Sequence, residues 1–114
     1  MTAKTLFQKI LDHEIPSQLL HEDELCGAFR DISPQAPVHV LIVPRKPIPG
    51  VSALESGDAA IVGHLFEVAR KLAAELGLGS GFRLVVNDGA DGGQTVPHLH
   101  VHLLGGRPLR WPPG

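Results

Sequence analysis

The sequence predicts an α+β fold, with one short helix, one long helix and about five mostly antiparallel strands. Two segments carry apolar residues at helical spacing. The other apolar segments are short and are separated by turns rich in proline and glycine, of which the chain has 10 and 13. With 114 residues, the chain is predicted to be a single domain, residues 1–114, whose long helix lies on one face of the sheet.

The first half of the chain is predicted to begin with the short helix and to continue as strands. Thr5 is a good N-cap residue, and apolar residues recur with helical spacing directly after it. This helix is predicted to end before Pro16, because proline is not tolerated inside a helix. Strands are predicted over residues 18–23, 26–31 and 38–43, with a proline-containing loop at residues 33–37.

The second half of the chain is predicted to hold the long helix. The stretch from Ser52 to Glu55 has the Ser-x-x-Glu pattern of a capping box and is predicted to start a helical segment. The long helix itself is predicted over about residues 57–76, ended by Gly77. Strands are predicted over residues 82–86 and 96–104, with a glycine-rich turn at residues 87–94 between them and an irregular tail at residues 105–114.

The composition argues against several classes of protein. The formal net charge is −2, whereas a protein that neutralises many nucleic-acid phosphates is normally basic, so no nucleic-acid partner is expected. The apolar stretches are far shorter than the roughly 20 residues that span a bilayer, and no signal peptide is visible, so no membrane association is expected. The one cysteine, Cys26, has no disulfide partner within the chain. A cytoplasmic location is therefore the expectation.

The chemistry is expected in the run His98-Leu99-His100-Val101-His102. Successive side chains of a strand alternate between its faces, so the three histidines are predicted to share one accessible face. Solvent-facing strand positions are usually Thr, Lys, Glu or Arg, and three partly buried imidazoles oppose folding below about pH 6.5. Propensity does not explain this pattern, which therefore indicates a function.

Zinc binding is one interpretation of these histidines. The outer pair, His98 and His102, is separated by about 13 Å along a strand. Because Zn–N bonds are only about 2.0–2.1 Å long, all three imidazoles converge on one ion with difficulty, and a third ligand would come from His39 or a distant carboxylate. We therefore predict no metal and no cofactor, and leave adventitious zinc binding open.

Covalent chemistry at phosphorus is the preferred interpretation. A neutral imidazole is a good nucleophile near pH 7, and its phosphorus adduct is reactive enough to hydrolyse. His100 has a histidine on either side, and these neighbours can hold non-bridging oxygens and move a proton. For His100 to attack, one ring nitrogen must be free and the other must donate to a fixed acceptor, for which a backbone carbonyl is the natural candidate.

The glycine-rich turn before this run supports the phosphorus chemistry. Its residues supply side-chain amides, a hydroxyl and backbone N–H groups that can approach an anion closely. Considered alone, the same residues also suit an ordinary hairpin turn. The donors in question are Asn87, Gly89, Gly92, Gly93, Gln94 and Thr95.

Four blocks of the sequence resemble one known family, the histidine triad (HIT) proteins. The segment PHLHVHLLGGR (97–107) fits the pattern His-φ-His-φ-His-φ-φ, in which φ is apolar. The blocks FRDISPQAPVHVLIVPRK (29–46), RLVVNDGADGGQTV (83–96) and RWPPG (110–114) resemble the Hint branch, the histidine triad nucleotide-binding proteins. The resemblance covers essentially the whole chain from Leu6 to Gly114.

The resemblance implies a role for each matching residue. His100 matches the nucleophile that attacks an α-phosphorus to form a nucleotidyl-histidine, and His39, His98 and His102 match the supporting histidines. Asp31 matches the residue that binds the ribose hydroxyls. The apolar positions around the base are matched by Phe7, Ile10, Phe29 and Ile32, and the phosphate and leaving-group contacts by Asn87, Gly93, Gln94 and Thr95. Pro97 stands where some relatives have an aromatic residue, which puts the leaving-group preference in doubt.

The resemblance also implies a homodimer that binds a purine nucleotide with an AMP or GMP moiety. The long helix and a strand of each protomer join across a two-fold axis, so that the sheet continues through the dimer. The tail at residues 105–114, with Trp111, reaches toward the active site of the partner. In the absence of the resemblance, Trp111 would be read as a packing residue.

Three functional hypotheses follow. The first is a purine nucleoside phosphoramidase that cleaves the P–N bond of an AMP-amine or AMP-lysine type compound. The second is a dinucleoside polyphosphate hydrolase, and the third is a nucleotide-binding or scaffold protein without important catalysis. The blocks WPPG and DISPQAP favour the first, and His102 favours hydrolysis because nucleotidyl transferases of the superfamily carry glutamine there.

No function is predicted for the other histidines or for the cysteine. His13 and His21 are predicted to face solvent, and His64 to lie at the surface or in dimer packing. Cys26 is predicted to be a small buried or edge residue, because nothing near it in the sequence activates a thiol.

Overall fold

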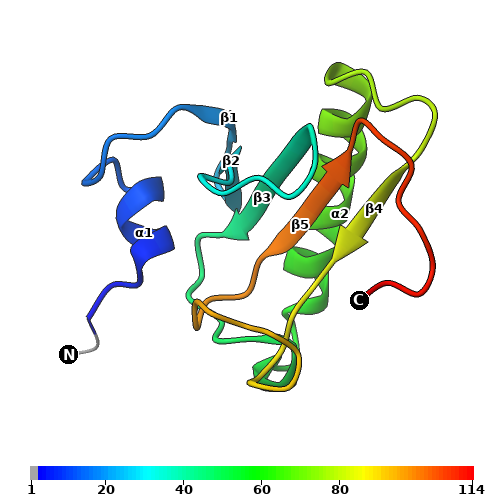
Figure 1. Ribbon diagram of the computed structural model, residues 1–114. Coiled ribbons are helices and arrows are strands. Elements are labelled where there is room, and N and C mark those ends of the chain that lie inside the picture. The colour runs from blue at the N-terminus through cyan, green and yellow to red at the C-terminus, as the bar shows by residue number, and fades with distance from the viewer. Residues whose placement is uncertain (1–2) are drawn as a thin grey trace.

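The predicted α+β fold is confirmed by a computed structural model, which describes residues 3–114. Within these residues a sheet of five strands, all neighbours antiparallel, is accompanied by two α-helices (Figure 1). The elements are α1 (Leu6–Leu11), β1 (Leu19–Glu22), β2 (Cys26–Arg30), β3 (Val38–Pro44), a 3₁₀ turn (Val51–Ala53), α2 (Ala59–Glu75), β4 (Phe82–Val85) and β5 (Val101–Gly105). Neither helix is long and apolar enough to cross a membrane.

The strand order β1-β2-β3-β5-β4 places the C-terminal strand inside the sheet. β1, β2 and β3 follow one another as antiparallel neighbours, and the chain then leaves the sheet through α2 before it returns as β4. β5 fits between β3 and β4. Strand β3 is therefore central, with β2 on one side and β5 on the other.

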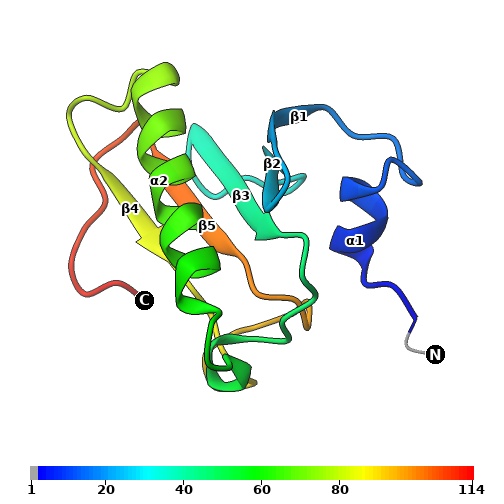
Figure 2. The same cartoon turned by 180° about the vertical axis from the view of Figure 1, so that it is seen from behind.

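The two helices cover opposite faces of the sheet, and α2 lies in front of the strands in Figure 2. Alternation along β3 separates the two cores: Val40 and Ile42 pack in the cluster with α2, whereas Leu41 and Val43 pack with α1. The α2 core contains Leu65, Val68, Ala69, Leu72 and Ala73 from the helix, and the smaller α1 core contains Phe7, Leu11 and Phe29. A side chain on a strand therefore belongs to one of two distinct layers.

The short helix α1 is held by its first residues. The hydroxyl of Thr5 accepts the N–H of Gln8 at 3.0 Å, and Oε1 of Gln8 accepts the N–H of Thr5 at 2.8 Å. This reciprocal capping box stabilises a helix by about 1 kcal/mol. The helix is short, so its position also depends on burial of Phe7 and Leu11 against the sheet, worth about 1.5–3 kcal/mol for each fully buried side chain.

The prediction of a strand over residues 96–104 is wrong in its first half, because β5 begins at Val101. Pro97 has no N–H to donate to a neighbouring strand. The backbone around it bends instead: the N–H of His98 donates to the carbonyl of Val96 at 2.8 Å, and the N–H of Leu99 donates to Ile48 at 2.7 Å.

The predicted capping box at Ser52 is wrong, and the long helix begins two residues later than expected. The backbone N–H of Ser52 donates to Oδ1 of Asp88 at 3.1 Å, so the residues of the expected capping box form only a 3₁₀ turn. Gly57 has a φ of +95°, which no helical residue adopts. The helix therefore begins at Ala59, after that glycine has redirected the chain.

Candidate active site

Four histidines gather on the face of the sheet that α1 covers. His39 comes from β3 and His102 from β5, whereas His98 and His100 lie in the irregular segment just before β5. The ring centroids of His39 and His102 are 5.2 Å apart, and those of His100 and His102 are 4.9 Å apart. The structure thus brings together the three histidines of the run and His39, which is distant in sequence.

The three histidines of the run do not form the exposed row that strand alternation predicts. His98 is 0% exposed and His100 only 5% exposed, because Phe7 of α1 packs edge-on against both rings. The prediction of an accessible face is therefore wrong for these two residues. Its physical reason is that α1 docks on this face and shields the rings from solvent.

His100 is held with one ring nitrogen engaged and the other free. Its Nδ1 lies 2.7 Å from the backbone carbonyl oxygen of His98. A carbonyl only accepts hydrogen bonds, so Nδ1 carries the proton and Nε2 carries the lone pair. Within residues 3–114 every fully buried side-chain nitrogen or oxygen has a partner, and Nε2 of His100 has none there, so Nε2 reaches solvent. The hydrogen bond predicted for an attacking imidazole is confirmed.

His98 is locked at both ring nitrogens. Its Nε2 lies 2.8 Å from the carbonyl of Pro44, at the end of β3, and must donate to it. Its Nδ1 therefore accepts, and the hydroxyl of Thr5 donates to it at 2.6 Å. Both nitrogens of His98 are occupied, so its ring fixes the backbone whose carbonyl orients His100.

His39 and His102 form a directed chain of hydrogen bonds. The backbone N–H of Gln35 donates to Nδ1 of His39 at 3.0 Å, so the proton of His39 is on Nε2. That Nε2 lies 2.9 Å from Nδ1 of His102 and donates to it. Nδ1 of His102 is therefore an acceptor, and its proton is on Nε2, which can donate to an oxygen of a ligand.

Burial keeps the supporting rings neutral. It lowers the pKa of His102 to about 4, with smaller contributions from His100 and His39. Burial also lowers the pKa of His98, although the carbonyl of Pro44 opposes the shift, and it lowers the pKa of His39, where Asp31 opposes it. Neutral rings at pH 7 agree with the tautomers assigned from the hydrogen bonds.

Asp31, the predicted ribose-binding residue, lies beside the chain of His39 and His102. Its Oδ1 accepts the N–H of Ser33 at 2.8 Å, and its Oδ2 lies 3.5 Å from Nε2 of His39. Its side chain is partly exposed. One carboxylate oxygen is thus fixed by the loop, which sets the direction of the other.

The predicted base-binding residues occupy different environments. Phe7 and Phe29 are buried and pack edge-on at 5.6 Å, and Ile10 is partly buried beside them. Ile32 is 99% exposed. The aromatic pair therefore forms part of the α1 core under the histidines, whereas Ile32 lies in the open on the loop after β2.

The glycine-rich turn uses most of its polar groups to hold its own shape. Nδ2 of Asn87 donates to the carbonyl of Gly92 at 2.6 Å. The amide of Gln94 receives the N–H of Gly89 at 2.9 Å and donates to the carbonyls of Pro49 and Val96. Gly93 has a φ of +79°, which favours glycine. Thr95 is exposed at the end of the turn.

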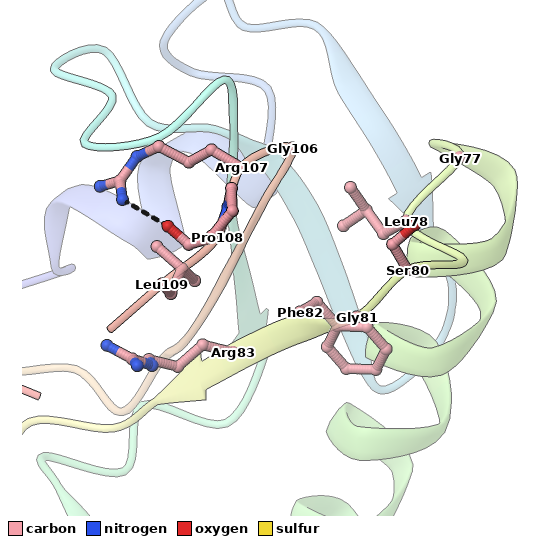
Figure 3. A pocket seen from close by; sticks show the side chains of 10 residues that line it. All are labelled: Gly77, Leu78, Ser80, Gly81, Phe82, Arg83, Gly106, Arg107, Pro108 and Leu109. Carbon is pink, nitrogen blue, oxygen red and sulfur yellow. Dashed lines mark hydrogen bonds between the residues drawn. The ribbon is translucent and has the colours of Figure 1, made fainter. Parts of the chain in front are cut away.

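A pocket of about 720 Å³ lies elsewhere, between β4 and the C-terminal tail (Figure 3). Its lining comes from the loop after α2, from Phe82 and Arg83 of β4, and from residues 106–109. None of the predicted site residues lines it. Trp111, beyond this lining, is 82% exposed.

Among residues 3–114, two clusters have the composition of a metal site. In the first, ligand atoms of Asp31, His39 and His102 lie within 4.8 Å of one another, but the two facing ring nitrogens already share a hydrogen bond. The second cluster lies on the α2 face, opposite the face that carries the four histidines. It consists of His21, Asp23, Cys26 and His64.

Sequence reasoning missed three groups that position the histidines. These are the hydroxyl of Thr5, the backbone N–H of Gln35 and the carbonyl of Pro44. Thr5 is predictable as a helix cap, but its contact with a residue 93 positions away leaves no local signal. Backbone groups carry no signal of their own in a sequence.

A five-stranded antiparallel sheet that carries the run His98 to His102, completed by His39, defines the class of histidine triad proteins. Residues 12–109 match the HIT domain, and the chain belongs to the HIT family. The family resemblance noted from the sequence is thereby confirmed.

Known relatives share both sequence and fold with this chain. An uncharacterized HIT-like protein of Synechocystis sp. is 56% identical over 114 residues, which cover 100% of each chain. A HIT family hydrolase from Legionella pneumophila is 46% identical with a TM-score of 0.94, covering 97% of this chain and 100% of that one. A histidine triad nucleotide-binding protein from Candida albicans is 30% identical with a TM-score of 0.81, covering 96% and 83% respectively.

Proposed function

We propose that this HIT protein is a nucleotide-binding hydrolase that cleaves the P–N bond of purine nucleoside 5′-phosphoramidates of the AMP-amine or AMP-lysine type. The observation that carries the proposal is the hydrogen bond from Nδ1 of His100 to the carbonyl of His98 at 2.7 Å. It leaves the lone pair of Nε2 free in a ring whose orientation is fixed, which is what nucleophilic attack by an imidazole requires.

The reaction proceeds in two balanced steps. Nε2 of His100 forms a bond to the α-phosphorus, the P–N bond to the amine breaks, and the leaving nitrogen takes a proton from solvent. Water then attacks the phosphorus of the nucleotidyl-histidine and gives up a proton to solvent, the bond to Nε2 breaks with its electron pair returning to the imidazole, and AMP leaves. The net change is phosphoramidate plus water to AMP plus amine.

The neighbouring histidines have unequal roles in this proposal. His102 presents a neutral Nε2–H that donates to a non-bridging phosphate oxygen, and His39 keeps that tautomer in place through the 2.9 Å hydrogen bond. His98 acts through its backbone carbonyl and is itself a positioning residue. The neutral state of these rings is set by burial, so it holds at neutral pH.

Nucleotide binding is supported by the surroundings of the triad and by related proteins. Asp31 offers Oδ2 to the ribose hydroxyls, while Phe7, Ile10, Phe29 and Ile32 supply apolar surface for a purine. Asn87, Gly93, Gln94 and Thr95 are proposed to contact the phosphate and the leaving group. Similarity to a HIT family hydrolase and to a histidine triad nucleotide-binding protein favours the same class of activity here.

We further propose that the active form is a cytoplasmic homodimer. β4 is an edge strand of the sheet, and Phe66 of α2 and Phe82 of β4 expose 45% and 44% of their surface. Exposed apolar residues beside a free edge suit the joining of two protomers. The tail with Trp111 would then reach the site of the partner.

A substrate panel tests the proposed activity. Purified protein is incubated with adenosine and guanosine 5′-phosphoramidates and, for comparison, with a diadenosine polyphosphate. We expect release of amine and nucleoside monophosphate from the phosphoramidates, and a nucleotide adduct on the wild-type protein in intact mass spectra under single turnover. Faster cleavage of the diadenosine polyphosphate would favour a dinucleoside polyphosphate hydrolase instead. Nucleotide binding with no turnover of any substrate would favour a nucleotide-binding or scaffold protein without catalysis.

A further inference from the structure

We infer that the chain carries a zinc-binding site on the face of the sheet opposite the histidine triad, formed by His21, Asp23, Cys26 and His64. His21 lies on β1, Asp23 in the turn that follows, Cys26 at the start of β2, and His64 on α2. Ligand atoms of the four side chains all lie within 4.8 Å of one another.

Topology brings these residues to the α2 layer. His21 pairs in register with Ala28, which belongs with Cys26 to the core cluster under α2. His64 is one turn of helix N-terminal to Val68 of that cluster. The site therefore lies where the β1–β2 hairpin meets α2, and none of its members takes part in the phosphorus chemistry proposed above.

Three side chains converge on one oxygen atom. Nε2 of His21 and Nε2 of His64 each lie 2.6 Å from Oδ2 of Asp23. Sγ of Cys26 lies 3.7 Å from the same oxygen. These four atoms come from four different side chains, and each is a common zinc ligand.

The turn after β1 fixes the orientation of the Asp23 carboxylate through hydrogen bonds, as hydrogen-bond partners commonly do for the ligands of a metal ion. Oδ1 of Asp23 accepts the N–H groups of Leu25 and Cys26, each at 2.8 Å. These two hydrogen bonds occupy one oxygen and aim the other at the imidazoles. A carboxylate fixed in this manner loses little freedom when it binds a cation.

The ligand set and the spacing suit Zn²⁺. Bonds of about 2.0–2.3 Å at tetrahedral angles separate neighbouring ligand atoms by about 3.3–3.6 Å. The sulfur–oxygen distance of 3.7 Å is already close to this range. The two nitrogen–oxygen distances of 2.6 Å must open by about 0.7 Å, a small rotation of the imidazoles. One thiolate, one carboxylate and two neutral imidazoles balance the two charges of the ion.

A zinc ion can reach the cluster from solvent. A cavity of about 380 Å³ opens on the surface beside α2, and both His21 and His64 line it. Cys26 is fully buried behind them. Solvent reaches the imidazole side of the cluster first, which is the side from which a hydrated ion would exchange its waters for ligands.

The test is a metal titration of the purified full chain after treatment with a chelator and a reductant. Calorimetry with Zn²⁺ should show one ion bound per chain, and the melting temperature should rise with Zn²⁺ because the ion binds the folded state. Co²⁺ serves as a coloured probe: a four-coordinate site with a thiolate gives strong visible bands and a sulfur-to-cobalt charge-transfer band.

Four variants locate the site. Cys26→Ser should lose the charge-transfer band, and Cys26→Ser and His64→Gln should each weaken Zn²⁺ binding by more than about 100-fold, beyond the 10–100-fold cost of losing an outer-shell partner. His13→Gln, which removes an exposed histidine, and His102→Gln, which alters the triad, should bind Zn²⁺ as the wild type does. Circular dichroism confirms that each variant is folded.

Clear results would overturn the inference. Absence of stoichiometric Zn²⁺ binding to the folded wild type would show that the cluster is only a hydrogen-bonded His-Asp-His bridge. A cobalt complex without a thiolate band, or binding that survives His64→Gln but is lost in His102→Gln, would place the ion elsewhere. None of these readouts depends on phosphoramidase activity.

Discussion

The backbone carbonyl of His98 accepts a hydrogen bond from Nδ1 of His100 at 2.7 Å, so one histidine of the run determines the tautomer of the next but one. The His98 ring in turn is bonded at both nitrogens, to Pro44 and Thr5. The orientation of the proposed nucleophile therefore depends on the end of β3 and on the cap of α1.

Replacement of the proposed nucleophile should abolish turnover without unfolding the protein. We expect His100→Ala to lower kcat for an adenosine phosphoramidate by at least about 10³-fold, since an enzyme without its nucleophile keeps little beyond binding and electrostatic stabilisation. AMP binding, measured by calorimetry, should persist. His13→Gln is the matched control, because the His13 side chain is 61% exposed and its ring bonds to Glu22 instead of to a histidine of the run. Equal turnover by wild type and His100→Ala would disprove the assignment.

Removal of the Thr5 hydroxyl should destabilise the fold and the site together. Thr5→Val loses the helix cap, worth about 1 kcal/mol, and leaves Nδ1 of the buried His98 without its donor, worth about 1–3 kcal/mol. Urea denaturation should show a loss of about 2–4 kcal/mol, whereas Thr5→Ser, which keeps the hydroxyl, should change stability by less than about 1 kcal/mol. A loss in Thr5→Ser as large as that in Thr5→Val would contradict the assignment of the effect to the hydroxyl.

Stability should fall as the pH is lowered from about 6.5 toward 4. The pKa of His102 is lowered by burial from 6.5 to about 4, so the unfolded chain takes up a proton in this range that the folded chain does not. The unfolded state binds more protons, and the stability present above pH 6.5 is lost on acidification. His98 and His39 act in the same direction.

Denaturant titrations at pH 5 and pH 7.5 measure this effect. For His102 alone we expect a difference of about 1–2 kcal/mol, less than the full shift implies because the ring is partly exposed. His102→Gln has no proton to gain and should show a smaller dependence on pH than the wild type. A variant with the same dependence would assign the effect to other groups.

The glycine-rich turn should be intolerant of a side chain at Gly92. A Cβ there would collide with the backbone oxygen of Asp88 and lie 2.9 Å from its nitrogen. Gly92→Ala should cost about 1–3 kcal/mol and should raise KM for the phosphoramidate, because the turn cannot keep its shape. At Gly79 a Cβ meets nothing within 4 Å. Gly79→Ala should therefore stay within about 0.5 kcal/mol of the wild type.

Local patterns predicted the elements of the fold well and their ends less well. The capping residue Thr5 and the apolar stripe of α2 are local signals, and both helices form where such signals occur. The strand predicted over residues 96–100 does not form, because the missing N–H of Pro97 outweighs the alternation of apolar residues. The helix α2 begins two residues later than predicted because Gly57 adopts a positive φ.

In the candidate site, too, local features were predicted from the sequence and long-range contacts were not. The chemistry of a neutral imidazole predicted that one ring nitrogen of His100 donates to an acceptor, and the backbone carbonyl of His98 is that acceptor. The resemblance alone assigned His39 to the phosphorus chemistry, because its contact with His102 spans 63 positions and leaves no local signal. The exposure predicted for His21 is wrong, since its side chain is 14% exposed. Its bond to Asp23, and that of His64 41 positions away, arises from the packing of α2 on the hairpin.

The hydrogen bond between Thr5 and His98 joins positions 93 residues apart and thus closes almost the entire chain into one loop. Contacts of such sequence separation are slow to form, because the entropy of closing the loop must be overcome first. A chain that has formed its sheet but not docked α1 would hold the histidines without a fixed His98. Hydrolytic competence would then be acquired at the last step of folding, and a chain released early would be inert toward its substrate.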